Sequence, residues 1–133
     1  MEEITKTPQQ IYLDKINEVL NLIGARYHDK LNGIYAFGDY KIKPMFAEKY
    51  SIAYTAMLDD EAQGKEIVIN ASVYNAQGIL VNVDFNKDEF LDIYRAVKDI
   101  YIPIEKTYQQ FLAELSQQPT MERLQYIVEH NEF

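Results

Sequence analysis

The sequence predicts an α+β fold, with an N-terminal helix, an antiparallel meander sheet of four or five strands, and two or three C-terminal helices packed on one sheet face. Apolar residues recur at helical spacing near the N-terminus and in the last third of the chain, and they alternate with polar residues between these regions. Turn residues separate the alternating runs. Because 133 residues suit one domain and no linker-like segment is visible, we expect a single α+β domain over residues 1–133.

The first helix is predicted to begin at Thr7 and Pro8 and to end near His28. Thr7 can act as the N-cap, and Pro8 suits the first helical position because its missing N–H would have no partner there. The apolar stripe that follows has helical spacing: Leu13, Ile16, Val19, Leu20, Ile23 and Tyr27. We expect this stripe to enter the core, with a helix–helix dimer seam as the alternative. Together with open sheet edges, the stripe also indicates a homodimer.

Three strands are predicted between residues 34 and 58. Turn signals at residues 32–33 and 38–39 flank a short apolar run and predict a short hairpin, whose second strand ends at Pro44. The run "KYSIAYTAML" then alternates and predicts a half-buried strand. One of its faces carries Tyr50, Ile52, Tyr54, Ala56 and Leu58. The segment "DDEAQGK" is predicted to be the connecting loop after this strand.

The strongest local prediction is a second hairpin in "IVINASVYNAQGILVNVDF", residues 67–85. "NAQG" suits a type I turn with Gly78 in the left-handed conformation, which places Asn75 opposite Ile79. On one face this register pairs Val73 with Val81, Ala71 with Val83 and Ile69 with Phe85. On the other face it pairs Tyr74 with Leu80, Ser72 with Asn82 and Asn70 with Asp84. The turn chemistry and the hydrophobic pattern therefore predict the same register.

The rest of the chain is predicted to be helical. Asn86 and Glu89 form a capping box at the start of a helix. Pro103 is expected to break or kink that helix, and Pro119 is expected to start a last short helix. The buried stripes of these helices are predicted to include large apolar residues: Phe90, Ile93, Tyr94, Val97, Ile100, Ile104, Tyr108, Phe111, Leu112, Leu115, Leu124, Ile127 and Val128.

Composition excludes several classes of protein. The net charge is −8, from 13 basic and 21 acidic side chains, so we expect no direct binding to nucleic acid or to anionic membranes. The absence of cysteine excludes disulfides and thiolate metal sites. The N-terminus is acidic and polar, unlike a secretory signal, and no run approaches the roughly 20 apolar residues of a membrane span. We therefore expect a cytoplasmic protein.

No motif in the sequence identifies a catalytic or cofactor site. His28 and His130 are far apart in the sequence and fall at predicted helix ends, where histidine is favoured by the helix dipole. We therefore predict no metal site, no cofactor and no catalytic residue. The least favoured alternative is a small enzyme that uses carboxylates, Asp84 or Glu66, together with a tyrosine.

Two surfaces are predicted to bind a partner. The first is the polar hairpin face, which lacks the lysine and glutamate typical of a solvated strand and offers Tyr74 as an anchor. The second is the single acidic run of the chain. The candidate partner-binding residues are Asn70, Ser72, Tyr74, Asn82, Asp84, Asp59, Asp60 and Glu61. The alternatives are a solvated ladder of polar pairs on the hairpin and a solvated acidic turn.

The sequence thus predicts a non-catalytic acidic binding protein. Its expected role is to inhibit a protein partner, which can be basic, in the manner of an immunity protein, an antitoxin or a phage anti-defence factor. The alternative is a small-molecule, nucleotide-like binding or sequestering protein, although the chain has only three arginines for phosphate binding. The acidic α+β composition and the terminal helix loosely resemble those of secretion chaperones. That family usually places a helix between its strands, where this sequence predicts none.

Overall fold

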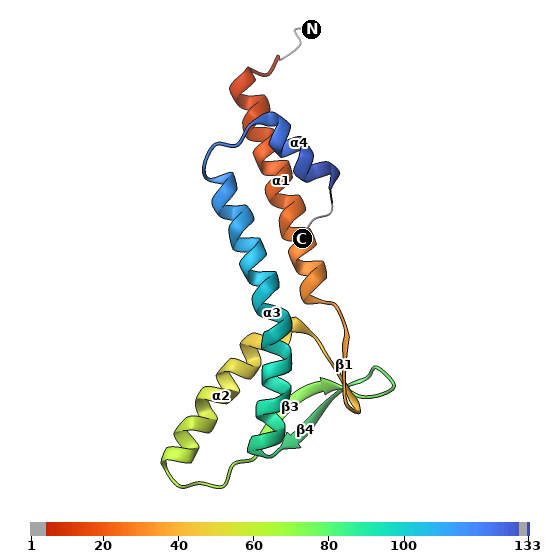
Figure 1. Cartoon of the computed structure of the whole chain (residues 1–133), viewed down its shortest axis with the longest axis vertical. Helices are drawn as coiled ribbons and strands as arrows, with labels where there is room; N and C mark the ends of the chain where they lie inside the picture. The colour runs from red at the N-terminus through yellow and green to blue at the C-terminus, as the bar shows by residue number, and fades with distance from the viewer. Residues whose placement is uncertain (1–4, 131–132) are drawn as a thin grey trace. The chain divides into compact units, whose positions relative to one another are not determined.

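A computed structural model describes residues 5–130 and 133 and shows an α+β fold with an antiparallel sheet (Figure 1). The elements in chain order are α1 (Pro8–Leu31), β1 (Tyr35–Phe37), β2 (Tyr40–Ile42), the 3-10 helix η1 (Pro44–Phe46), α2 (Ala47–Ala62), β3 (Ile69–Tyr74), β4 (Leu80–Phe85), α3 (Lys87–Leu115) and α4 (Met121–Glu129). The predicted fold class is confirmed. The chain divides into two compact units, which we call the helical unit (residues 1–29 and 104–133) and the sheet unit (residues 30–103).

The sheet unit contains a four-stranded antiparallel meander in the order β1-β2-β3-β4. Every predicted pair of the β3–β4 hairpin is confirmed, from Tyr74 opposite Leu80 to Ile69 opposite Phe85. The Asn75 N–H donates to the Ile79 carbonyl at 2.9 Å, and Gly78 has a φ of 78°, as the predicted turn requires. The short β1–β2 hairpin, which ends before Pro44, is also confirmed.

The predicted strand "KYSIAYTAML" is wrong, because these residues lie in helix α2. Tyr50 and Met57 are each 2% exposed, and their spacing of seven residues is two helical turns. Ile52, which the strand prediction placed on the same face as Tyr50, is 73% exposed. The run fits both periods, so its local pattern does not decide between strand and helix. Helix α2 thus lies between β2 and β3 in the chain, where the sequence pattern predicted no helix.

The core of the sheet unit lies between the apolar hairpin face and the helices α2 and α3, which lie beside β3 and β4 in Figure 1. Val73, Phe90, Ile93 and Val97 are each 0% exposed. Tyr50 is also buried, and its hydroxyl donates to the backbone carbonyl of Ser72 at 2.6 Å. Burial raises the pKa of Tyr50 far above its ordinary value, so this hydroxyl remains a donor at any physiological pH.

Helix α3 begins at the predicted capping box, but it continues past Pro103. Its capping box is present, since the Asn86 N–H donates to Glu89 Oε1 at 3.0 Å and the Glu89 N–H donates to Asn86 Oδ1 at 2.9 Å. Of the break or kink predicted at Pro103, the break is wrong, because α3 runs without interruption from Lys87 to Leu115. Pro103 removes one backbone donor, and because Pro103 is exposed, water can satisfy the carbonyl that loses its partner.

The helical unit buries one side of α1 against α3 and α4. Thr7 caps α1 as predicted, accepting from the Gln10 N–H at 3.2 Å, and Thr120 caps α4, which starts two residues after the predicted Pro119. The core residues are Val19, Ile23, Leu115, Leu124 and Ile127. Arg26 closes the far end of α4 by donating to the carbonyls of Ile127, Val128 and His130 at 2.8–3.1 Å. The predicted core stripe of α1 is only partly correct, since Leu13 is 50% exposed and Leu20 is 36% exposed.

A bidentate ion pair links the end of α3 to α4 and makes stability depend on pH. Arg123 Nε lies 2.5 Å from Glu114 Oε2, and Nη2 lies 2.9 Å from Oε1, which holds the pKa of Glu114 below its ordinary value of 4.5. A carboxyl group whose pKa is lower in the folded state stabilises that state at pH values above its pKa in the unfolded chain. This contribution is lost as the pH falls through its pKa in the folded state. We expect Glu114→Gln to lower the free energy of unfolding near pH 7 by about 0–1 kcal/mol, because the pair is partly exposed.

Urea unfolding of the wild type and of Glu114→Gln at about pH 7 and about pH 3 checks this expectation. The difference between the two proteins should shrink in acid, where the wild-type carboxyl becomes protonated. A difference that stays constant over this range would show that the ion pair is not its cause.

Candidate functional site

The polar face of the β3–β4 hairpin carries two cross-strand hydrogen bonds. Asn70 Nδ2 donates to Asp84 Oδ1 at 3.0 Å, and the Ser72 hydroxyl donates to Asn82 Oδ1 at 2.8 Å. Asn70, Asn82 and Asp84 are exposed, and Ser72 is half-buried. The register therefore brings four of the predicted binding residues together as a ladder. The side chains of the ladder can make further hydrogen bonds to a partner, because an amide or a carboxylate can make more than one hydrogen bond.

Strand β4 is an edge of the sheet in the described part of the chain. The hydrogen bond between Asn75 and Ile79 fixes which backbone groups face β3, because such pairs alternate along an antiparallel ladder. Val81, Val83 and Phe85 direct their N–H and C=O groups toward β3. The corresponding groups of the alternate β4 residues therefore point away from the sheet. The residues with outward backbone groups are Leu80, Asn82 and Asp84.

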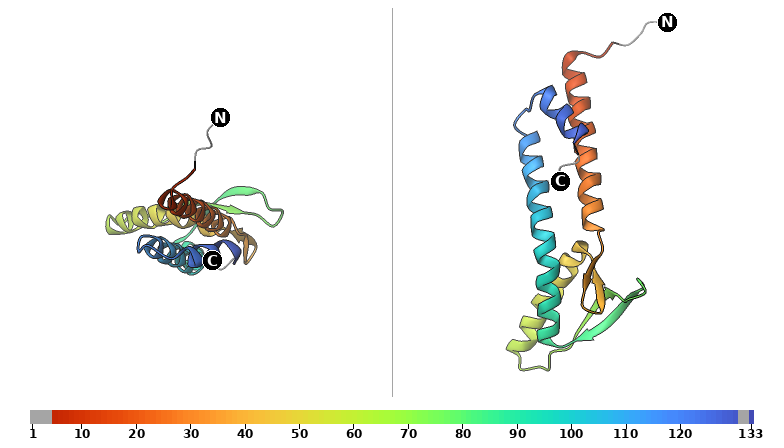
Figure 2. Two further views of the ribbon diagram at one scale, coloured as in Figure 1. Left: turned by 90° about the horizontal axis from the view of Figure 1, so that it is seen from above. Right: turned by 45° about the vertical axis from the view of Figure 1, so that its right-hand side comes forward.

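This edge lacks the usual protection against strand pairing. Sheet edges are commonly blocked by lysine, by proline or by an inward-pointing charge. Strand β4 contains no lysine and no proline, and its one charged residue is Asp84, next to its C-terminal end. Ile79 is 60% exposed and Leu80 is 54% exposed, where the hairpin turn extends beyond α2 and α3 of the same unit (Figure 2). The hairpin therefore offers exposed apolar side chains beside unpaired backbone donors and acceptors.

Tyr74 is less accessible than an anchor residue would be. Its ring stacks on Phe46 of η1, with centroids 5.8 Å apart, and the Lys43 ammonium lies 5.0 Å from the centroid of the Tyr74 ring. Tyr74 is half-buried as a result. The Phe46 contact arises from the turn at Pro44, which the sequence pattern did not connect with the hairpin. Truncation of Tyr74 would consequently disturb the packing of η1 as well as any contact with a partner.

The predicted acidic loop is wrong, because Asp59, Asp60 and Glu61 lie in the last turn of α2. Carboxylates are unfavourable at a helix C-terminus, and nearby lysines offset this effect. Lys65 Nζ lies 3.9 Å from Asp60, and Lys87 Nζ lies 2.5 Å from Glu61. The Glu61 carboxylate raises the pKa of Lys87 through this contact. Both lysines lie within the sheet unit, so Asp60 and Glu61 already form ion pairs inside this unit.

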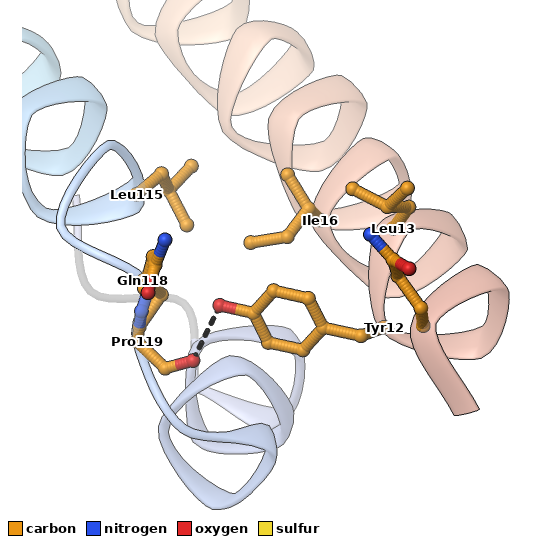
Figure 3. A pocket seen from close by; sticks show the side chains of 7 residues that line it. Tyr12, Leu13, Ile16, Leu115, Gln118 and Pro119 are labelled. Carbon is orange, nitrogen blue, oxygen red and sulfur yellow. Dashed lines mark hydrogen bonds between the residues drawn. The ribbon is translucent and has the colours of Figure 1, made fainter.

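A hollow in the helical unit was not anticipated from the sequence (Figure 3). It has a volume of about 540 Å³ and is lined by Gln9, Tyr12, Leu13, Ile16, Leu115, Gln118 and Pro119. The Tyr12 hydroxyl points across it and donates to the Pro119 carbonyl at 2.7 Å. Gln118 has a φ of 54°, a left-handed conformation that is strained for a residue other than glycine. The wall contains neither a carboxylate nor a basic side chain.

Within residues 5–130 and 133, no group of three histidine or acidic side chains is arranged to hold a metal ion. In the same part of the chain, every helix is too short or too polar to cross a lipid bilayer. No family model matches the chain, and no curated protein and no solved structure shows significant similarity to it.

Proposed function

We propose that the chain is a non-catalytic binding protein that inhibits a protein partner, of the immunity, antitoxin or phage anti-defence type, and that the β3–β4 hairpin is its docking element. The observation that carries the proposal is the edge strand β4, which has no lysine or proline, in an exposed hairpin whose one charged residue is Asp84. An edge of this kind accepts a strand from another protein. The new main-chain hydrogen bonds supply affinity, and the side chains beside them supply specificity.

The chemistry of the hairpin supports a protein ligand. The outward N–H and C=O groups of Leu80, Asn82 and Asp84 match the spacing of a strand in a partner. The ladder of amides, hydroxyl and carboxylate can bind polar side chains on the face of the added strand. Ile79 and Leu80 provide apolar contact at the tip. The net charge of −8 favours encounter with a basic partner by electrostatic steering.

Proline replacement at Asn82 separates backbone recognition from side-chain recognition. Asn82→Pro removes an N–H that points away from β3, and proline is tolerated at such edge positions. Asn82→Ala removes the same side-chain amide and keeps the N–H. We expect Asn82→Pro to weaken capture of the partner at least about tenfold and Asn82→Ala to weaken it by less than about threefold.

The measurement is affinity capture from the native host with wild-type, Asn82→Pro and Asn82→Ala baits, followed by quantitative mass spectrometry of the retained proteins. Thermal unfolding of each bait provides the control for folding. A partner that binds all three baits equally would exclude the β4 edge as the docking site. Equal loss with both variants would assign recognition to the side-chain ladder instead.

A second candidate function is binding of an uncharged small molecule in the hollow of the helical unit. The apolar wall and the amides of Gln9 and Gln118 favour such a ligand. No arginine or lysine lines the hollow, so the phosphates of a nucleotide would lack a counter-charge there. Native mass spectrometry of the purified protein distinguishes this candidate. A retained small ligand that is lost from Ile16→Gln and kept by Asn82→Pro would support the hollow as its site.

A further inference from the structure

The edge strand β4 presents a different chemistry at each of its ends. Where β4 begins, Leu80 is 54% exposed, and the preceding Ile79 is 60% exposed. Where β4 ends, Asp84 is exposed, and Asp88 and Glu89 follow in the first turn of α3. A strand added to this edge therefore meets apolar side chains at one end and carboxylates at the other.

The carboxylate of Asp84 is open to a cation from outside the chain. Its Oδ1 accepts from Asn70 at 3.0 Å, and no lysine or arginine of the described residues forms an ion pair with it. The nearest basic residue along the chain, Lys87, is held by Glu61 at 2.5 Å. A basic side chain on an added strand would therefore meet an unpaired carboxylate, and the net charge of −8 favours its approach.

The apolar face of β4 is incompletely covered at this edge. Val81 and Val83 pack on the core of the sheet unit but are only half-buried, unlike Phe85, which is 4% exposed. Strand β3 covers one side of both valines, so their exposed part faces the open edge. Because the backbone groups of these valines point toward β3, an antiparallel strand would meet them at non-hydrogen-bonded positions, where opposed Cα atoms approach to about 4.5 Å. Apolar residues at these positions of the added strand would complete the burial.

We infer that the β4 edge selects an antiparallel strand whose residues, from the N-terminus, are basic, apolar, polar, apolar and apolar. This preference rests on the docking function proposed for the hairpin. The basic residue lies opposite Asp84, the polar residue opposite Asn82 and the last apolar residue opposite Leu80. The two apolar residues between them lie opposite Val83 and Val81.

The antiparallel direction continues the pattern of the whole sheet, and antiparallel pairing is slightly more stable than parallel pairing. A second copy of the chain does not match the order of residues. Its two edge strands, β1 and β4, contain no basic residue that could meet Asp84. The occupant that fits the edge is therefore an extended segment of a different protein with a basic residue at its N-terminal end.

Two capped peptides of identical composition test the direction and the order. The forward peptide contains Lys-Val-Thr-Val-Leu, and the reversed peptide contains Leu-Val-Thr-Val-Lys. In an NMR titration with up to about 2 mM forward peptide, the largest changes should fall on the amide N–H groups of Leu80, Asn82 and Asp84. The reversed peptide should bind at least about threefold more weakly, because the antiparallel register places its leucine beside Asp84 and its lysine beside Leu80.

Three variants of the protein locate the contact. Asp84→Asn should weaken binding of the forward peptide about threefold, because it removes the charge pair and keeps an acceptor for Asn70. Asp92→Asn is the matched control, since it removes the same charge at an exposed residue of α3 outside the hairpin, and it should bind like the wild type. Asn82→Pro should weaken binding at least about tenfold, because it removes an outward N–H at the centre of the edge.

Failure of the forward peptide to bind at about 2 mM would overturn the inference, as would equal or tighter binding of the reversed peptide. Binding that is unchanged in Asp84→Asn or in Asn82→Pro would do the same. A wild-type dimer that Asn82→Pro dissociates would assign the edge to a second copy and also reject the inference. The proposed function can fail separately. Host capture that depends on the Asn82 N–H, without preference for the forward peptide, would support docking at β4 and reject this order of residues.

Discussion

Phe90→Ala is expected to lower the free energy of unfolding of the sheet unit by about 3–5 kcal/mol, the usual range for removal of a buried phenylalanine. Phe90 is 0% exposed. Its ring lies 5.8 Å from that of Tyr50 and 5.7 Å from that of Tyr94, centroid to centroid, and so connects α2 with α3. Alanine would leave a cavity between α2 and α3, and the Tyr50 hydroxyl must keep its bond to the Ser72 carbonyl while the rings shift. Equilibrium urea unfolding measures the change as a lower midpoint at an unchanged slope.

Ile52→Ala is the control for this prediction, and it also tests the helical assignment of α2. Ile52 is 73% exposed, so its truncation should change stability by less than about 0.5 kcal/mol. If residues 49–58 formed a half-buried strand, Ile52 would share the buried face with Tyr50, and its loss would be costly. A destabilisation by Ile52→Ala similar to that of Phe90→Ala would therefore contradict the packing of α2 and α3.

The hairpin could be predicted because two local signals agree. The turn "NAQG" fixes which residues lie opposite one another, and the alternation from Ile69 to Tyr74 fixes the same register. A one-residue slip would mix polar and apolar side chains on each face. Helix α2 had no such agreement, because Tyr50, Tyr54 and Leu58 repeat with a period of four and also share a strand face. Its short apolar pattern therefore needed tertiary contacts to decide between helix and strand.

The surfaces were less predictable than the elements. The polar pairs of the ladder follow from the register alone, but the burial of Tyr74 depends on Phe46, almost thirty residues earlier in the chain. The hollow unites α1 with the turn after α3, from opposite ends of the sequence. The left-handed conformation of Gln118 could not be predicted, because this conformation is normally expected of glycine or asparagine. The exposure of Leu13 and Leu20 could not be predicted, because the apolar stripe of α1 is wider than the face on which Val19 and Ile23 are buried.

Val73→Asp is expected to unfold the sheet unit at neutral pH. Val73 is 0% exposed and lies opposite Val81, on the hairpin face that packs against the helices. An aspartate there would have no buried cation to pair with, because no polar or charged residue is buried in the described part of the chain. Burial of an unpaired carboxylate costs several kcal/mol, comparable with the whole stability of many domains. Far-UV circular dichroism and urea unfolding should show loss of the cooperative transition.

Asn82→Asp is the matched comparison, because it introduces the same side chain on the opposite face of the hairpin. Asn82 is exposed, and its carbonyl oxygen Oδ1 accepts from Ser72, a role that a carboxylate oxygen can keep. We expect a loss of less than about 1 kcal/mol, mostly from repulsion with the nearby Asp84. A folded Val73→Asp with wild-type stability would therefore contradict the packing of the apolar hairpin face against α2 and α3.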